Sequence, residues 1–123
     1  MTSMDRRFAG ARLIQNQAIG KKRDDPLPSL LAQLLALAGE PTTVERAVSR
    51  PWASALFEGR RHLIRLHVHG EDYRMRSLML MAVLTDAEWQ ISGHFVADIT
   101  VDNGDVDNKG VWLDLSALTI EDR

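Results

Sequence analysis

Two histidines separated by one residue, His67 and His69, are the clearest candidates for chemistry in this chain. In a β-strand, side chains two positions apart share a face about 7 Å apart at the backbone, so two imidazoles can close on one metal ion. His94 and Asp98 share a face of a second predicted strand and would complete four ligands. The pattern predicts a divalent transition metal site if the two strands are neighbours. The alternative is that His67 lies beside Trp52 and that no metal is bound.

A second candidate is a basic surface with an aromatic neighbour, on one face of a β-hairpin predicted over residues 50–70. Arginine recognises carboxylates and phosphates, and aromatic rings stack on bases. We therefore expect a surface for a partner protein or a small acidic ligand, made of Trp52, Arg61, Arg65 and His67. Alternatively, Glu58 and the acidic C-terminal region neutralise these arginines.

Residues 102–110 form an acidic segment, DNGDVDNKG, that resembles the start of a calcium-binding loop. In such loops alternating oxygen ligands wrap the ion, and a glutamate at the twelfth position binds it through both oxygens. Counted from Asp105 as the first position, Lys109 stands at the fifth position of such a loop and Ser116 at the twelfth. The segment is better interpreted as a hairpin tip rich in Asn, Asp and Gly.

Hydroxyl, imidazole and carboxylate groups also occur in combinations that nucleophilic enzymes use. Ser54 or Ser92 is available to join His67 or His94 and Asp98. None of these serines lies in a recognisable nucleophile motif, and a chain of this composition offers such triples by chance. The sequence therefore favours a protein without enzymatic activity and without a cofactor.

The hairpin that positions the first two candidates is predicted from Gly59, which suits the first central position of a two-residue turn at Gly59-Arg60. This turn places Phe57 opposite His62 and Trp52 opposite His67. Alternation then sorts the side chains into two faces. The inward face would hold Ala53, Ala55, Phe57, His62, Ile64, Leu66 and Val68. The outward face would hold Trp52, Ser54, Leu56, Glu58, Arg61, Leu63, Arg65, His67 and His69.

Helical patterns occupy three other segments. Apolar residues recur at helical spacing in 4–19, ahead of a charged, proline-containing linker. Residues 29–38 are apolar nearly all round, so this helix would need cover on more than one side, from the domain or from another subunit. A helix over 75–84 would bury one stripe, made of Met75, Leu78, Met79, Ala82 and Val83.

Strand patterns occupy the rest of the chain. Residues 42–49 suit either a strand or a helical turn, and we favour a strand leading into the hairpin. Residues 94–101 and 111–115 alternate, which predicts a second hairpin with Phe95, Ala97, Ile99, Val101, Val111, Leu113 and Leu115 inward. Leu118 and Ile120 fall out of this phase, which predicts a bulge near Ser116-Ala117.

Composition sets the class of protein. The chain has 123 residues, no cysteine and a net charge of −2, which favours one globular domain in a reducing compartment. It has neither a secretory signal nor an apolar run of membrane-spanning length, so we expect a soluble cytoplasmic protein. Charge is uneven: residues 1–23 carry six bases and one acid, giving +5, and residues 98–123 carry seven acids and two bases, giving −5.

These patterns predict a single α+β domain: a basic helix and linker over residues 1–26, followed by a core over 27–123. The core would be an antiparallel sheet of four or five strands built from two hairpins, with helices packed on one face as a two-layer sandwich. The predicted function is a non-enzymatic interaction module that self-associates, most simply as a dimer. The alternatives are a metal-binding protein or metal-dependent enzyme using the His-x-His pair, and a nucleic-acid-binding protein using the basic N-terminal arm.

Overall fold

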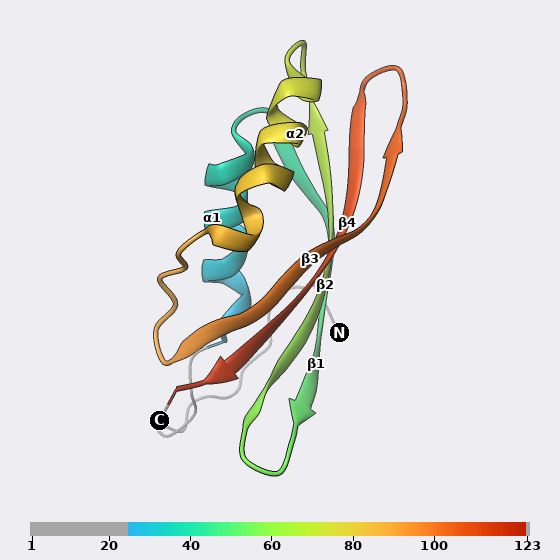
Figure 1. The fold of residues 1–123 in the computed structure, drawn as a ribbon. Helices are drawn as coiled ribbons and strands as arrows, with labels where there is room; N and C mark the ends of the chain where they lie inside the picture. The colour runs from blue at the N-terminus through green and yellow to red at the C-terminus, as the bar shows by residue number, and fades with distance from the viewer. Residues whose placement is uncertain (1–24, 123) are drawn as a thin grey trace.

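The computed structural model describes residues 25–122, which form an α+β arrangement of one antiparallel sheet and two α-helices (Figure 1). The strands lie in the order β1-β2-β4-β3, so the two hairpins join through β2 and β4. Figure 1 shows both helices on the same side of the sheet. The predicted four-stranded antiparallel sheet built from two hairpins is confirmed. In chain order the elements are α1 (Leu27–Ala38), β1 (Thr42–Ala53), β2 (Glu58–His69), α2 (Tyr73–Val83), a 3-10 turn η2 (Leu84–Asp86), β3 (His94–Val106) and β4 (Gly110–Glu121).

Strict alternation on β2 builds the core. His62, Ile64, Leu66 and Val68 point toward the helices, and each is at most 2% exposed. Because directly paired residues share a face, the neighbouring strand β4 contributes its own alternating set to the same layer. The predicted inward face of β2 and the strand over 42–49 are therefore confirmed. The core also includes Leu30, Leu34 and Ala38 of α1, Leu80 and Leu84 after β2, and Val111, Leu113, Leu115 and Ala117 of β4.

The first hairpin turns at residues 54–57, and the predicted turn at Gly59-Arg60 is wrong. The Ser54 amide donates to the Phe57 carbonyl oxygen at 2.8 Å, and β1 and β2 pair from Ala53↔Glu58 onward. Phe57 is therefore half exposed in the turn instead of lying in the core. Gly59 is a glycine for another reason: a Cβ there would lie 1.9 Å from the Thr119 carbonyl oxygen of β4.

The bulges of the second hairpin lie on β3. Pairing between β3 and β4 shifts by one residue at Ala97 and again at Asp102, whereas β4 pairs with β2 without interruption. The predicted bulge near Ser116-Ala117 is wrong, because residues 117–120 lose alternation for a different reason: this part of a central strand is buried on both faces. The prediction that Phe95 and Ala97 point inward is wrong, because the first bulge reverses the phase of β3 between Val96 and Asp98 and leaves both residues exposed.

Helix α1 is covered mainly on one side. Its buried residues form one line, and leucines beside that line are half-buried. Its outward positions include Ala32 and Ala36, whose small side chains expose little apolar surface. We expected this helix to be covered on more than one side, by the domain or by another subunit, but its outward side does not require such a contact. Its partly exposed Leu37 lies at the edge toward α2.

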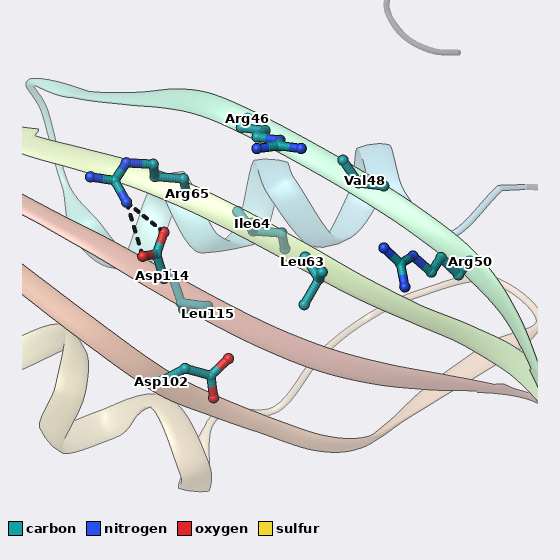
Figure 2. A pocket seen from close by; sticks show the side chains of 9 residues that line it. All are labelled: Arg46, Val48, Arg50, Leu63, Ile64, Arg65, Asp102, Asp114 and Leu115. Atoms are coloured by element: carbon teal, nitrogen blue, oxygen red, sulfur yellow. Dashed lines mark hydrogen bonds and ion pairs between the residues drawn. The ribbon is translucent and has the colours of Figure 1, made fainter.

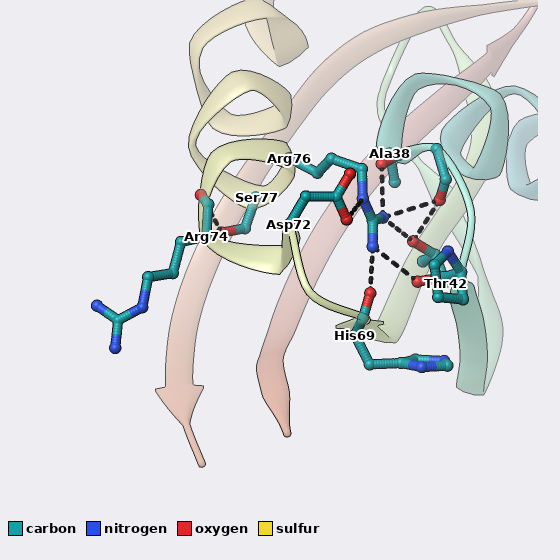
Figure 3. Close-up of polar contacts among 9 residues, drawn as sticks. Ala38, Thr42, His69, Asp72, Arg74, Arg76 and Ser77 are labelled. Carbon is teal, nitrogen blue, oxygen red and sulfur yellow. Dashed lines mark hydrogen bonds and ion pairs between the residues drawn. The ribbon is translucent and has the colours of Figure 1, made fainter. Parts of the chain in front are cut away.

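Helix α2 presents the opposite face from the one that we predicted. It buries Ser77 and Leu80, while Met75, Leu78 and Met79 are 65%, 64% and 59% exposed. Arg76 explains this orientation, because its guanidinium reaches inward past the end of α1 and donates to the carbonyl oxygens of Ala38 and Gly39 at 3.0 and 3.1 Å (Figure 3).

Within residues 25–122, neither helix has the length and apolar character needed to span a lipid bilayer. The predicted helix over residues 4–19 and the basic arm that includes it lie outside the described residues.

Candidate functional site

The face of the sheet away from the helices carries Arg61, Arg65 and His67, the outward residues of β2, and the residues paired with them on β1 and β4. We call this surface the open sheet face. Trp52 belongs to it, as predicted, but lies opposite Gly59 instead of His67. Gly59 and His67 are eight residues apart on β2, which at about 3.3 Å per residue is a distance of about 26 Å along the strand. The four residues that we expected to form one surface are thus spread along the whole strand.

Arginines face each other across β1 and β2 on the open sheet face. Arg46 is paired with Arg65, and Arg50 with Arg61. Like charges directly opposite in a sheet repel each other, so these pairs lower stability unless an anionic group lies nearby. Arg65 has such a group, because its guanidinium donates to both carboxylate oxygens of Asp114 at 2.9 Å. Among residues 25–122, the other three arginines form no ion pair with an acid.

Three of these arginines line a cavity of about 350 Å³ on the open sheet face (Figure 2). Arg46, Arg50 and Arg65 line it together with two carboxylates, those of Asp102 and Asp114, and with the apolar side chains of Val48 and Leu63. The sequence indicated Arg61 and Arg65, but it did not indicate Arg46 and Arg50. The signal that would have found them is the alternation of residues 46–52, read with the turn moved to 54–57; a register shift between Val44 and Arg46 breaks the alternation before them.

Acidic residues occupy the other two strands of the open sheet face. Asp98 pairs with Leu118 and Asp105 with Trp112, both of them outward residues of β4. Asp102, at the second bulge, accepts hydrogen bonds from the hydroxyls of Thr100 at 3.0 Å and Ser116 at 3.2 Å. The face therefore has a basic half on β1 and β2, made of Arg46, Arg50, Arg61 and Arg65. Its acidic half on β3 and β4 is made of Asp98, Asp102, Asp105 and Asp114.

A stack of rings lies at one end of this face. His67 stacks on Trp112, with 3.9 Å between ring centroids and 5° between planes, and the His69 ring centroid is 4.9 Å from that of His67. Trp112 donates its indole N–H to Asp107, and this hydrogen bond is the main reason that the pKa of Asp107 is lowered. The guanidinium of Arg65 lies 5.0 Å from the Trp112 ring centroid. His67 and Arg65 thus both contact the indole ring.

The four predicted metal ligands do not converge. His67 and His69 lie together on β2, but β4 separates β2 from β3, which carries His94 and Asp98. His94 is paired with Glu121 at the opposite end of the sheet and is buried, with its Nδ1 3.0 Å from the Ser92 carbonyl oxygen. No group of three or more metal-ligating side chains gathers anywhere in residues 25–122. The condition for the predicted site, neighbouring strands, is not met.

The hydroxyl–imidazole contacts in the structure involve residues that the sequence did not indicate. His62 lies between Ser49, whose Oγ is 2.6 Å from Nδ1, and Thr119, whose Oγ1 is 2.8 Å from Nε2. Burial is the largest cause that lowers the pKa of His62, to about 4. The ring is therefore neutral at pH 7 and closed to solvent. The geometry makes it a hydrogen-bonded core residue.

The serines that the sequence did indicate have structural contacts. Ser54 caps the first turn, since its Oγ accepts from the Phe57 amide at 3.2 Å. Ser92 meets His94 through its backbone carbonyl and not through its hydroxyl. At the acidic hairpin tip, one oxygen of Asp107 accepts from the amides of Lys109 and Gly110, both at 2.8 Å. These contacts stabilise turns.

Apolar side chains are exposed together on the outer face of α2. We call this surface the α2 patch. Polar side chains are the ordinary occupants of such positions on a surface helix, so a contiguous apolar group there is a candidate contact surface. The sequence indicated these residues but assigned them to the core. The α2 patch consists of Met75, Leu78, Met79, Ala82 and Val83.

Comparison of the chain with known protein families, with curated proteins and with solved structures finds no match in any of the three.

Proposed function

We propose that this protein is a non-enzymatic interaction module that self-associates. The observation that carries the interaction module is the α2 patch, in which Met75, Leu78 and Met79 are each more than half exposed. Self-association rests on the charges of the open sheet face. Burying a side chain of this size stabilises a complex by about 1.5–3 kcal/mol when its whole surface leaves water. A patch of such residues is a surface that gains from a protein contact.

The open sheet face supports the same proposal from its charges. Within residues 25–122, Asp114 compensates Arg65, whereas Arg46, Arg50 and Arg61 have no carboxylate partner, so the pairs Arg46–Arg65 and Arg50–Arg61 are unfavourable in this part of the chain. An acidic group supplied by a partner would remove this cost. The imidazole that the fold surrounds with hydroxyls, His62, is fully buried and has a lowered pKa, which favours structure over catalysis.

Light scattering of the full chain across the micromolar range tests self-association. We expect a mean mass that rises with concentration from that of the monomer toward that of a dimer. A strictly monomeric mass at every concentration would contradict the proposal.

A second candidate function is binding of a small acidic ligand in the cavity between Arg46, Arg50 and Arg65. The cavity has a suitable volume of about 350 Å³, and arginine suits carboxylates and phosphates. Calorimetric titration with citrate and with inorganic phosphate tests it, and Arg50→Gln should weaken any binding. Absence of heat from both anions at millimolar concentration would rule out this site for them.

A further inference from the structure

The charges of the open sheet face are arranged so that the face complements itself. We propose that two copies of this chain pack face to face through their open sheet faces, around a two-fold axis that runs parallel to the strands between β2 and β4. This inference rests on the proposed self-association and specifies which surface makes the contact. It leaves the α2 patches on the outer sides of the dimer.

The position of the axis follows from the strand order. A two-fold axis in the interface and parallel to the strands reverses the order β1-β2-β4-β3, so β1 of one copy faces β3 of the other. The basic half then lies over the acidic half twice. An axis across the strands would instead place β1 over β1 and arginine over arginine. Only the first arrangement brings opposite charges together.

Individual rows of the sheet show the match in detail. One row reads Arg50, Arg61, Leu118, Asp98 from β1 to β3. When the row is reversed in the second copy, Asp98 lies over Arg50 at both edges. In the middle Arg61 lies over Leu118, which is only 9% exposed and adds little to the contact. Arg50 of the edge strand β1, which has no acidic partner within residues 25–122, thus meets the carboxylate of Asp98 on the edge strand β3 of the other copy.

A second row behaves in the same way. It reads Arg46, Arg65, Asp114, Asn103, with Asp102 at the bulge beside Asn103. Reversal places Asn103 and the adjacent Asp102 over Arg46, and Asp114 over Arg65. Between the two charged rows lie Val48 and Leu63, of which Leu63 is 42% exposed. The proposed interface therefore has apolar residues between charged pairs.

The area of the face suits a dimer. Its strands are 12 or 13 residues long. At about 3.3 Å per residue and about 4.8 Å between strands, four strands span about 760 Å² in projection, of which the part around Leu118 and Ile120 is already buried. Stable interfaces of standard size bury about 800 Å² per partner. Stacked sheets pack about 10 Å apart, close enough for long arginine and aspartate side chains to meet.

Charge reversal at one contact tests the inference. Arg50→Asp and Asp98→Arg each place like charges together in the proposed dimer, and each should raise the dissociation constant about tenfold or more. The double variant Arg50→Asp/Asp98→Arg restores opposite charges and should return the constant to within about threefold of the original protein. Arg74→Asp is the matched control, because Arg74 is an exposed arginine on the helix layer. It should leave the mass unchanged.

A variant of the α2 patch separates this inference from the proposed function. Leu78→Asp/Met79→Asp should remain dimeric by light scattering.

If that variant is monomeric while the Arg50 and Asp98 variants remain dimeric, the contact surface is wrong and self-association stands. If the single reversals weaken the dimer but the double variant does not recover, the pairing is overturned. If Arg50→Asp instead abolishes binding of inorganic phosphate without changing the mass, the face is an anion site. If the original protein is monomeric throughout, both proposals fail.

Discussion

His62 joins three strands through one buried ring. Its two nitrogens meet hydroxyls of Ser49 on β1 and Thr119 on β4, so the ring accepts at one nitrogen and donates from the other. Both polar atoms are satisfied while the ring is neutral. A proton on the ring would put a charge into a buried site next to Arg60 and Arg61, and this explains the direction of its pKa.

Stability should therefore depend on pH through His62. The pKa is about 6.5 in an unfolded chain and about 4 in the fold, so between these values the unfolded state takes up a proton that the folded state does not. The contribution is present above pH 6.5 and is lost as the pH falls toward 4, by roughly 3 kcal/mol in total. Urea unfolding at several pH values in this window measures it.

His62→Gln is the control for this prediction. It keeps hydrogen-bonding capacity but cannot titrate, so its stability should change much less between pH 6.5 and 4. The pKa values of Asp72 and Asp107 are lowered from the usual value of 3.8, so these two carboxylates affect stability below the range from pH 6.5 to 4 in which His62 titrates. Parallel pH profiles for the original protein and the variant would contradict the assignment.

Arg76 is the second residue on which much of the structure depends. Within a few ångströms its guanidinium contacts Asp72, the Thr42 hydroxyl, the carbonyl oxygens of Ala38 and Gly39 at the end of α1, and those of Pro41 and His69 (Figure 3). Helix ends leave carbonyl oxygens without intrahelical donors, and an arginine near them supplies the missing donors.

Replacing Arg76 with methionine should lower the free energy of unfolding by about 3 kcal/mol, because several half-buried carbonyl oxygens lose their donor at once. Arg74→Met is the matched control, since Arg74 lies two residues earlier on the same helix and is exposed; we expect about 0.5 kcal/mol or less. Chemical denaturation of both variants gives the comparison. Equal losses would show that Arg76 does not orient α2.

At the scale of elements, the contact between the two hairpins depends on a glycine. Gly59 of β2 approaches Thr119 of β4 so closely that a Cβ would be 1.9 Å from a backbone oxygen. Gly59→Ala should therefore displace the strands and cost roughly 3 kcal/mol. Gly104→Ala on β3 is the control, because its Cβ would lie 3.4 Å from a Leu113 methyl group and 3.7 Å from the Trp112 carbonyl oxygen, both within ordinary contact or close to it. Thermal unfolding of the two variants should differ clearly; similar midpoints would contradict the close approach.

The orientation of α2 gives a second prediction at this scale. Met79 and Leu80 are neighbours in the chain, but Met79 is 59% exposed and Leu80 is 0% exposed. Leu80→Ala should cost about 2–5 kcal/mol of stability, whereas Met79→Gln should change it by about 0.5 kcal/mol or less. Urea unfolding of both variants is sufficient. A larger loss of stability from Met79→Gln than from Leu80→Ala would instead show that α2 is oriented as we predicted from the sequence.

At the scale of the whole molecule, the proposed dimer has four layers: helices, two stacked sheets, and helices. The contact combines exposed ion pairs with a few apolar side chains, so salt should weaken it. We expect the dissociation constant to rise several-fold when sodium chloride is increased from low to high concentration, measured by sedimentation. A contact through the α2 patches would instead be insensitive to salt, or strengthened by it.

The fold class was predictable from the sequence because its signals are local. Alternation along β2 sets which side chains face inward whatever the turn does, so His62, Ile64, Leu66 and Val68 are buried as predicted. The helix over residues 29–38 and the strand over 42–49 follow from patterns within those segments. The same local rule placed Arg61, Arg65 and His67 on one face.

Other features were decided only by contacts between distant segments. Gly59 looked like a turn residue, because a turn and a close strand approach both favour glycine, and only the neighbouring β4 distinguishes them. The apolar stripe of α2 pointed to the core by itself, but Arg76 binds the end of α1 and turns that stripe outward. Strand order is likewise nonlocal: β4 lies between β2 and β3, which separates His67 from His94 and opposes arginines to aspartates on one face.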